Sequence, residues 1–334
     1  MASDLSTTSS QVVAVVGPTA VGKSRLAEEI AVRLGGEVVS ADAMQVYTGM
    51  DIGTAKTPPL ARRVPYHCVD LVEPGYPFSA ALYQREARAA IESIASSSAL
   101  PVLVGGTGLY IRAALDDWEF PRGDASSARR AELEMEAEVH GAEALHARLV
   151  ELDPASAALI HPANVRRTVR ALEMADEGAS YAAQASGFSD RQSIYDTRFL
   201  GLTMDREQLY ARIGRRVDAM LDAGLVDEVS GLLDSGLREA LTAAQAIGYK
   251  ELVPVIEQGA DLREAADSIK QASRRYAKRQ MTWFRGDDRI MWIDVTERRA
   301  GEVLDAALGL IESQTPAATG TPAPGTWRLT ADCS

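Results

Sequence analysis

Short apolar runs alternate with helical patterns in the first third of the chain. Gln11-Val-Val-Ala-Val-Val16 is continuous and β-branched, as expected of a strand that is covered on both faces. The segment 23–34 that follows has apolar residues at helical spacing, and the runs 37–40 and 100–104 flank a helical pattern over roughly 80–96. Strands that alternate with helices in this order predict an α/β fold, with a parallel sheet and helices on both of its faces.

The pattern becomes almost wholly helical between about 120 and 285, apart from the strand-like run 197–202, and 289–294 again has the pattern of a strand. A helical segment between two parts of one sheet indicates an inserted helical domain. The predicted divisions are a flexible N-terminus (1–10), an α/β core (11–119), the helical insertion (120–200), a return to the core with basic C-terminal helices (201–312) and a disordered tail (313–334).

Composition narrows the class of protein. With 334 residues, 46% of them hydrophobic, the chain can bury a substantial core. It shows no basic leader followed by an apolar stretch and no run of about 18 apolar residues, so we expect a cytoplasmic protein without a membrane span. Cys68 and Cys333 have no metal-binding spacing, and for Cys68 we expect a packing role only.

Charge is unevenly distributed along the chain. The net charge of −12 argues against a protein that binds nucleic acid non-specifically, because the long-range field repels a polyanion. Basic residues nevertheless cluster at 166–170 and at 270–285, while acidic residues concentrate at 131–139. A local basic surface is therefore compatible with the acidic total.

A glycine-rich loop follows the first predicted strand. Residues 17–24, G-P-T-A-V-G-K-S, fit the pattern G-x-x-x-x-G-K-[ST] between a strand and a helix. Backbone N–H groups in such a loop point at an anion, Lys23 adds a positive charge, and the Ser24 hydroxyl can ligate Mg²⁺. We therefore expect the loop to bind a diphosphate or nucleotide through Gly17, Pro18, Thr19, Ala20, Val21, Gly22, Lys23 and Ser24. The motif alone leaves open whether the phosphate is transferred, hydrolysed or released as a leaving group.

Two acidic residues could serve this loop in different ways. A kinase needs a further carboxylate for Mg²⁺, but the strand at 101–104 ends in Gly105-Gly-Thr-Gly108, and Asp70 is only a weak substitute. Asp42 follows the second strand, and the carboxyl ends of parallel strands meet at one ligand crevice. Asp42 could act as a general base there, or it could merely cap the turn after the strand.

Six segments of the chain together resemble one family in order and spacing. They are G-P-T-A-V-G-K-S (17–24), S-A-D-A-M-Q-V-Y-T-G-M-D-I-G-T-A-K (40–56), G-G-T-G-L-Y (105–110), H-P-A-N-V-R-R-T-V-R-A-L-E (161–173), A-A-Q-A-I-G-Y-K-E (243–251) and R-R-Y-A-K-R-Q-M-T-W-F-R (274–285). The chain resembles the bacterial tRNA dimethylallyltransferases, or tRNA isopentenyltransferases, over residues 11–312. The resemblance implies a P-loop NTPase-like fold. It also implies transfer of a dimethylallyl group from dimethylallyl diphosphate to the exocyclic 6-amino group of the adenosine 3′-adjacent to the anticodon, with release of diphosphate.

The resemblance also implies roles for individual residues. Asp42 corresponds to the catalytic base, with Thr107 and Lys23 as the other catalytic residues, and Arg216 corresponds to an arginine that reaches the donor's phosphates, although Arg212 and Arg215 are alternatives. The residues implied to contact tRNA are Asp42, Ala43, Met44, Gln45, Thr107, Arg166, Arg167, Thr168, Val169 and Arg170. Without the resemblance, the arginines at 166–170 have the pattern of a solvated helix face.

The expected partners follow from the resemblance: the tRNA anticodon stem-loop, dimethylallyl diphosphate and Mg²⁺, with a monomeric protein and no obligate protein partner. This chain departs from the family at Ala43, where serine is common, and at Arg166, where glutamine is common. Two alternatives remain. One is an adenylate isopentenyltransferase, which has no need of basic helices, and the other is a small-molecule kinase that binds ATP in the same loop.

Overall fold

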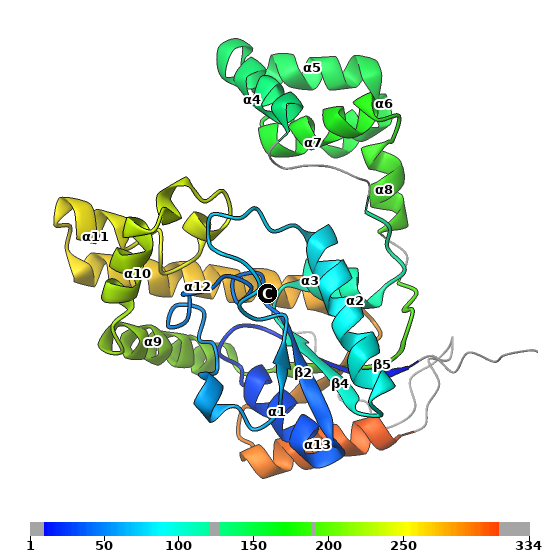
Figure 1. The fold of residues 1–334 in the computed structure, drawn as a ribbon, viewed down its shortest axis with the longest axis vertical. Coiled ribbons are helices and arrows are strands. Elements are labelled where there is room, and N and C mark those ends of the chain that lie inside the picture. The colour runs from blue at the N-terminus through cyan, green and yellow to red at the C-terminus, as the bar shows by residue number, and fades with distance from the viewer. Residues whose placement is uncertain (1–9, 121–126, 189–190, 314–334) are drawn as a thin grey trace, which may run out of the picture. The chain divides into compact units, whose positions relative to one another are not determined.

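The computed structural model describes residues 10–120, 127–188 and 191–313, which fall into two compact units (Figure 1). Among the described residues, the core unit contains 10–115 and 195–313, and the inserted unit is Asp116–Ile194. The predicted flexible N-terminus (1–10) and disordered tail (313–334) fall outside the described residues except for their inner residues 10 and 313, and so does the segment 121–126 within the predicted insertion.

The core unit is built on a six-stranded sheet with the strand order β3-β2-β4-β1-β5-β6. The strands are β1 (Gln11–Val16), β2 (Gly36–Ala41), β3 (Tyr66–His67), β4 (Leu100–Gly105), β5 (Asp196–Thr203) and β6 (Met291–Asp294). All five neighbouring pairs are parallel. The predicted α/β class with a parallel sheet is therefore confirmed. The pattern did not reveal β3, because two residues are too short to show periodicity.

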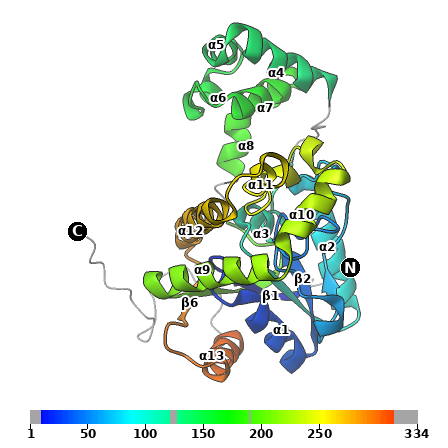
Figure 2. The same ribbon diagram turned by 90° about the vertical axis from the view of Figure 1, so that its left-hand side faces the viewer.

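Helices cover both faces of this sheet (Figure 2). The side chains of β1 alternate between two hydrophobic clusters: Val12, Ala14 and Val16 belong to one, and Val13 and Val15 to the other. The first cluster includes buried residues of α2 (Ala80–Ser96) and α3 (Gly108–Leu115), and the second includes buried residues of α1 (Lys23–Leu34) and α13 (Ala300–Glu312). A strand that is apolar on both faces, as β1 is, requires this double cover.

The remaining helices of the core unit follow β5 in the sequence. They are α9 (Arg206–Asp222), α10 (Leu225–Asp234), α11 (Val253–Gln258) and α12 (Leu262–Arg285), with short 3₁₀ turns at Leu237–Glu239 and Ala243–Gln245. A further 3₁₀ turn, Pro59–Ala61, lies between β2 and β3. The long helix α12 packs against α9 and α3. None of the helices within the described residues is both long enough and apolar enough to cross a membrane.

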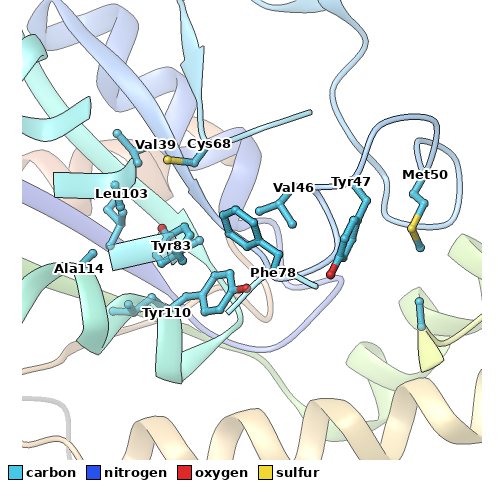
Figure 3. Packing of buried hydrophobic residues seen from close by; sticks show 14 of the residues in the cluster. Val39, Val46, Tyr47, Met50, Cys68, Phe78, Tyr83, Leu103, Tyr110 and Ala114 are labelled. Atoms are coloured by element: carbon cyan, nitrogen blue, oxygen red, sulfur yellow. The ribbon is translucent and has the colours of Figure 1, made fainter. Parts of the chain in front are cut away.

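Aromatic packing anchors the loop that follows β2 (Figure 3). Tyr83 of α2 and Tyr110 of α3 stack with ring centroids 4.0 Å apart, and the Tyr83 hydroxyl donates a hydrogen bond to the Ser40 carbonyl at 2.9 Å. Val46 and Tyr47 of the loop are fully buried in the same cluster. The segment that carries Asp42 is therefore held against the core at both of its ends.

The inserted unit is helical, with α4 (Ala128–His140), α5 (Ala142–Leu152), α6 (Pro154–Leu159), α7 (Val165–Asp176) and α8 (Tyr181–Gly187). Leu133, Leu149 and Leu172 are fully buried in its own hydrophobic cluster. The compact unit ends at Ile194, before the predicted boundary of 200, because β5 starts at Asp196 and pairs with β1 from Asp196 to Gly201.

Candidate active site

The glycine-rich loop runs from β1 into α1 with an unusual backbone. Gly17 has φ +140°, and a Cβ atom added there would lie 2.6 Å from the Leu202 carbonyl oxygen of β5. Ala20 and Gly22 also have positive φ angles, of 65° and 108°. The loop then delivers the first N–H groups of α1, which have no acceptor within the helix, to one place. This is the geometry of an anion site at a helix N-terminus.

Lys23 lies across this loop, where its Nζ donates a hydrogen bond to the Pro18 carbonyl at 2.6 Å. Burial and the nearby Arg216 guanidinium lower the pKa of Lys23 to about 7, and Asp42 opposes this shift. Burial also lowers the pKa of Arg216, again opposed by Asp42. Lys23 and Arg216 repel each other, and Asp42 offsets only part of this repulsion. A bound anion such as diphosphate would therefore be favoured here, because it would relieve the repulsion between the two cations.

A pocket of about 320 Å³ opens beside the loop in the core unit. Seven of the predicted site residues line it: Thr19, Ala20, Asp42, Ala43, Met44, Thr107 and Arg216. The facing wall comes from α9, the start of α10, the segment 245–250 and α12. Its apolar side chains include Ile213, Val217, Met220, Leu225, Ile247 and Ile269. The pocket therefore joins a charged end to an apolar wall of the kind that a short hydrocarbon group would contact.

Asp42 occupies the turn after β2 and lines the pocket. Its Oδ1 accepts a hydrogen bond from the Met44 N–H at 2.9 Å, which is the turn-capping contact that the sequence left as an alternative. Capping uses one carboxylate oxygen only. The two roles considered for Asp42 are thus compatible in one side chain.

Thr107 lies at the junction of β4 and α3 and lines the same pocket as Asp42. Its Oγ1 accepts a hydrogen bond from the Ala43 N–H at 3.1 Å. Tyr276 of α12 lies close to Thr107, and burial, followed by the charge of Asp42, raises the pKa of its hydroxyl. Thr107 therefore lies between the backbone beside Asp42 and a neutral hydroxyl group in the pocket wall.

The glycines around Thr107 allow three elements to meet. A Cβ atom at Gly105 would lie 2.1 Å from the Ala41 carbonyl oxygen of β2. At Gly106 it would lie 2.1 Å from Gln280 Nε2, and at Gly108 2.0 Å from Trp283 Nε1, both on α12. The motif G-G-T-G is therefore a steric requirement of this junction as well as a family signature.

One of the three candidate arginines on α9 lines the pocket. Arg216 is half-buried and lies among the lining residues, whereas Arg215 is exposed. Arg212 is half-buried but does not line the pocket. Arg215 and Arg216 are adjacent in α9 and therefore point in different directions, whereas Arg212 lies one turn before Arg216 on the same side of the helix, away from the pocket lining.

Two polar side chains next to the pocket, the buried Gln280 and the half-buried Glu228, were not singled out from the sequence. Gln280 of α12 accepts from the Thr19 N–H at 2.8 Å and donates to the Gly106 carbonyl at 2.9 Å. Glu228 of α10 accepts from the Tyr249 hydroxyl at 2.6 Å and from three consecutive backbone N–H groups, those of Asp51, Ile52 and Gly53. The available signal was a polar residue on an apolar helix face. Such a signal is weak, because the partners are distant in the sequence.

The other predicted residues of the core unit lie around the pocket rather than on its lining. Gly17, Pro18 and Val21 are buried, Gly22 is exposed, and Ser24 is exposed in the first turn of α1. The side chain of Gln45 accepts from the Ser40 hydroxyl and donates to the Thr54 carbonyl. Its amide therefore supports the loop after β2.

Asp70 forms ion pairs with Lys56 and Arg62 and does not line the pocket. No group of three or more acidic, histidine or cysteine side chains that could hold a metal occurs within the residues that the structure describes. A kinase-like arrangement of carboxylates around Mg²⁺ therefore has no support at Asp70.

The basic segment 166–170 belongs to α7 of the inserted unit. Arg166 and Arg167 are exposed in its first turn, whereas Thr168 and Val169 are fully buried. Arg170 is half-buried, 3.6 Å from the Glu173 carboxylate. The side chains of this segment that face solvent are thus mainly the first two arginines.

Comparison with known proteins identifies one family. The family model described as IPP transferase matches residues 45–287. The tRNA dimethylallyltransferase of Geobacillus kaustophilus is 49% identical over 289 residues, which cover 86% of this chain and 91% of that protein. That of Acidothermus cellulolyticus is 50% identical over 290 residues, covering 86% of this chain and 90% of that protein.

Solved structures give the same result. The tRNA isopentenylpyrophosphate transferase of Bacillus halodurans has a TM-score of 0.66 and 43% identity, covering 90% of this chain and 97% of that one. A eukaryotic dimethylallyltransferase acting on tRNA has a TM-score of 0.77 and 28% identity, covering 92% of this chain and 81% of that one.

Proposed function

The chain belongs to the IPP transferase family, and from this membership we propose that it transfers a dimethylallyl group from dimethylallyl diphosphate to tRNA. The acceptor is the exocyclic 6-amino group of the adenosine 3′-adjacent to the anticodon, and diphosphate is released. The observation that carries this proposal is the pocket in which the phosphate loop, Asp42, Thr107 and Arg216 meet beside an apolar wall.

The charged end of the pocket suits a leaving group. As the bond between the allylic carbon and the diphosphate oxygen breaks, the electron pair moves onto the diphosphate. The N–H groups at the start of α1, Lys23 and Arg216 are placed to stabilise this growing negative charge. No phosphoryl group moves in this reaction. The loop therefore needs no water or hydroxyl aligned on phosphorus.

The opposite side of the pocket suits the acceptor. An aryl amine is a poor nucleophile because its lone pair is delocalised into the ring. We propose that Asp42 accepts the proton of the 6-amino group while the new bond forms between nitrogen and the allylic carbon. Thr107 accepts a hydrogen bond from the Ala43 N–H, next to Asp42, and so holds this loop in place. We propose that Thr107 also faces the target adenine.

Mg²⁺ fits the loop as a partner of the diphosphate. Ser24 is exposed in the first turn of α1, where its hydroxyl could ligate the ion together with phosphate oxygens and water. Few protein ligands are needed, which agrees with the absence of a metal-binding cluster among the described residues. When bound, the ion would supply further neutralisation of the leaving diphosphate.

For the tRNA itself we propose contacts from both units. In the core unit the candidates are Asp42, Ala43, Met44 and Thr107 at the pocket, and in the inserted unit they are Arg166 and Arg167, which are exposed. An anticodon loop suits such an enzyme, because its bases are unpaired and can be turned out into a pocket.

An acceptor assay tests this function. The protein is incubated with Mg²⁺, radiolabelled dimethylallyl diphosphate and either unmodified tRNA with adenosine 3′ of its anticodon or free AMP. We expect label in tRNA alone. Label in AMP alone would establish an adenylate isopentenyltransferase instead, and label in neither, with phosphate released from ATP, would favour a kinase.

A further inference from the structure

Gln280 joins three parts of the site through one buried side chain. It lies on α12 and is 5% exposed. Its Oε1 accepts from the Thr19 N–H at 2.8 Å, and its Nε2 donates to the Gly106 carbonyl at 2.9 Å. The Tyr276 hydroxyl, one helical turn earlier on α12, lies close to the same amide. Through these contacts α12 meets the phosphate loop and the turn that carries Thr107.

We propose that Gln280 is a positioning residue. It fixes the phosphate loop relative to the Asp42–Thr107 side of the pocket, so that donor and acceptor are aligned for transfer. This inference rests on the proposed function. Through Thr19, Gln280 fixes the backbone from which the next N–H groups of the loop point at the diphosphate. Through Gly106 it fixes the peptide that precedes Thr107. Gln280 does not line the pocket, and we assign it an action through these neighbours.

The chemistry of the side chain fits this role. A primary amide offers an acceptor and two donor hydrogens at once, and the contacts with Thr19 and Gly106 need both kinds of group. Glutamate would lose the donors, and an apolar residue would leave the Thr19 N–H and the Gly106 carbonyl without a partner in a buried place. Gly106 has no Cβ atom, which is what allows the amide to reach the carbonyl.

The distance between the two ends of the pocket matters more for the rate than for binding. Donor and acceptor reach the pocket as separate molecules, and transfer requires the allylic carbon and the amine to be aligned. A misplacement of about 1 Å can cost about 10²-fold in rate. Loss of Gln280 should therefore lower kcat while each substrate still binds its own side of the pocket.

The principal test is Gln280→Met, which keeps the length of the side chain but removes its polar atoms. We expect kcat for dimethylallyl transfer to fall about 10²-fold, while KM for tRNA changes less than about threefold. Gln271→Met is the matched control, because Gln271 is exposed on the same helix. A merely structural role predicts instead a lower Tm and a smaller amount of otherwise normal enzyme. A kcat within about threefold of wild type would overturn the proposal.

A double-mutant cycle with Tyr276→Phe adds a second readout. Because the Tyr276 hydroxyl lies close to both Gln280 and Thr107, we expect the double variant to be no slower than Gln280→Met alone. Independent, multiplying losses would contradict a shared network. If Gln280→Met does not fold, Gln280→Glu, which keeps the acceptor for Thr19, takes its place with the same expected loss of kcat. Absence of transfer by the wild-type protein would refute the proposed function, whereas transfer by wild type and variants alike would refute this inference alone.

Discussion

Asp42 is the residue on which the proposed chemistry depends most. Replacing it with asparagine keeps the Oδ1 acceptor for the Met44 N–H, so the turn after β2 should survive. We predict that Asp42→Asn lowers kcat by about 10²-fold or more, because the amide cannot accept the amine's proton. Single-turnover transfer of label to tRNA measures this, and filter binding checks that tRNA affinity is nearly unchanged. Unchanged turnover would remove Asp42 as the base.

The pKa of Lys23 gives donor binding a pH dependence. With a pKa lowered to about 7, Lys23 is charged below that pH and largely neutral above it in the free protein. A bound diphosphate favours the charged form, so binding above about pH 7 must take up a proton, and the affinity should fall as pH rises. Calorimetric titration with inorganic diphosphate between about pH 6 and pH 9 measures this. Lys23→Met should lose the part of this slope that Lys23 contributes, and an equal pH dependence in wild type and Lys23→Met would contradict the assignment.

At the scale of elements, the site depends on a close junction of β2, β4 and α12. Gly106→Ala places a Cβ atom 2.1 Å from Gln280 Nε2, so we predict displacement of Gln280, a loss of kcat like that of Gln280→Met, and about 1–3 kcal/mol less stability. Gly231→Ala is the control, because that exposed glycine of α10 has open space around its Cβ position and alanine favours helix. Activity and Tm of Gly106→Ala equal to those of the control would contradict this account.

Local patterns in the sequence predicted most of these elements and the motifs at their ends. Four strands were recognisable because an apolar run is a pattern of residues that are adjacent in the sequence. They are the strands at 11–16, 37–40, 100–104 and 197–202. Gln280 was not singled out, because its partner Thr19 lies 261 residues away and nothing local marks the contact. The same reason applies to Glu228 and the N–H groups at 51–53.

At the scale of the whole molecule, an acidic protein must bind a polyanion through a limited basic surface. We predict that the double variant Arg166→Ala, Arg167→Ala weakens tRNA binding about tenfold or more. The slope of the logarithm of the binding constant against the logarithm of salt concentration should become shallower by roughly one to two. Donor affinity should not change, because both arginines belong to the inserted unit. Arg33→Ala, which removes one exposed positive charge from α1, is the control for the effect of each lost charge. Equal effects of variant and control on tRNA binding would refute a specific role for α7.

The central claim is that the phosphate loop holds a leaving group. The most direct measurement is the stoichiometry of products when wild-type protein, Mg²⁺, dimethylallyl diphosphate and unmodified tRNA react without ATP. The account predicts one diphosphate released for each dimethylallyl-adenosine recovered from the digested tRNA, with no monophosphate formed. Release of monophosphate, or product that appears only when ATP is added, would contradict it.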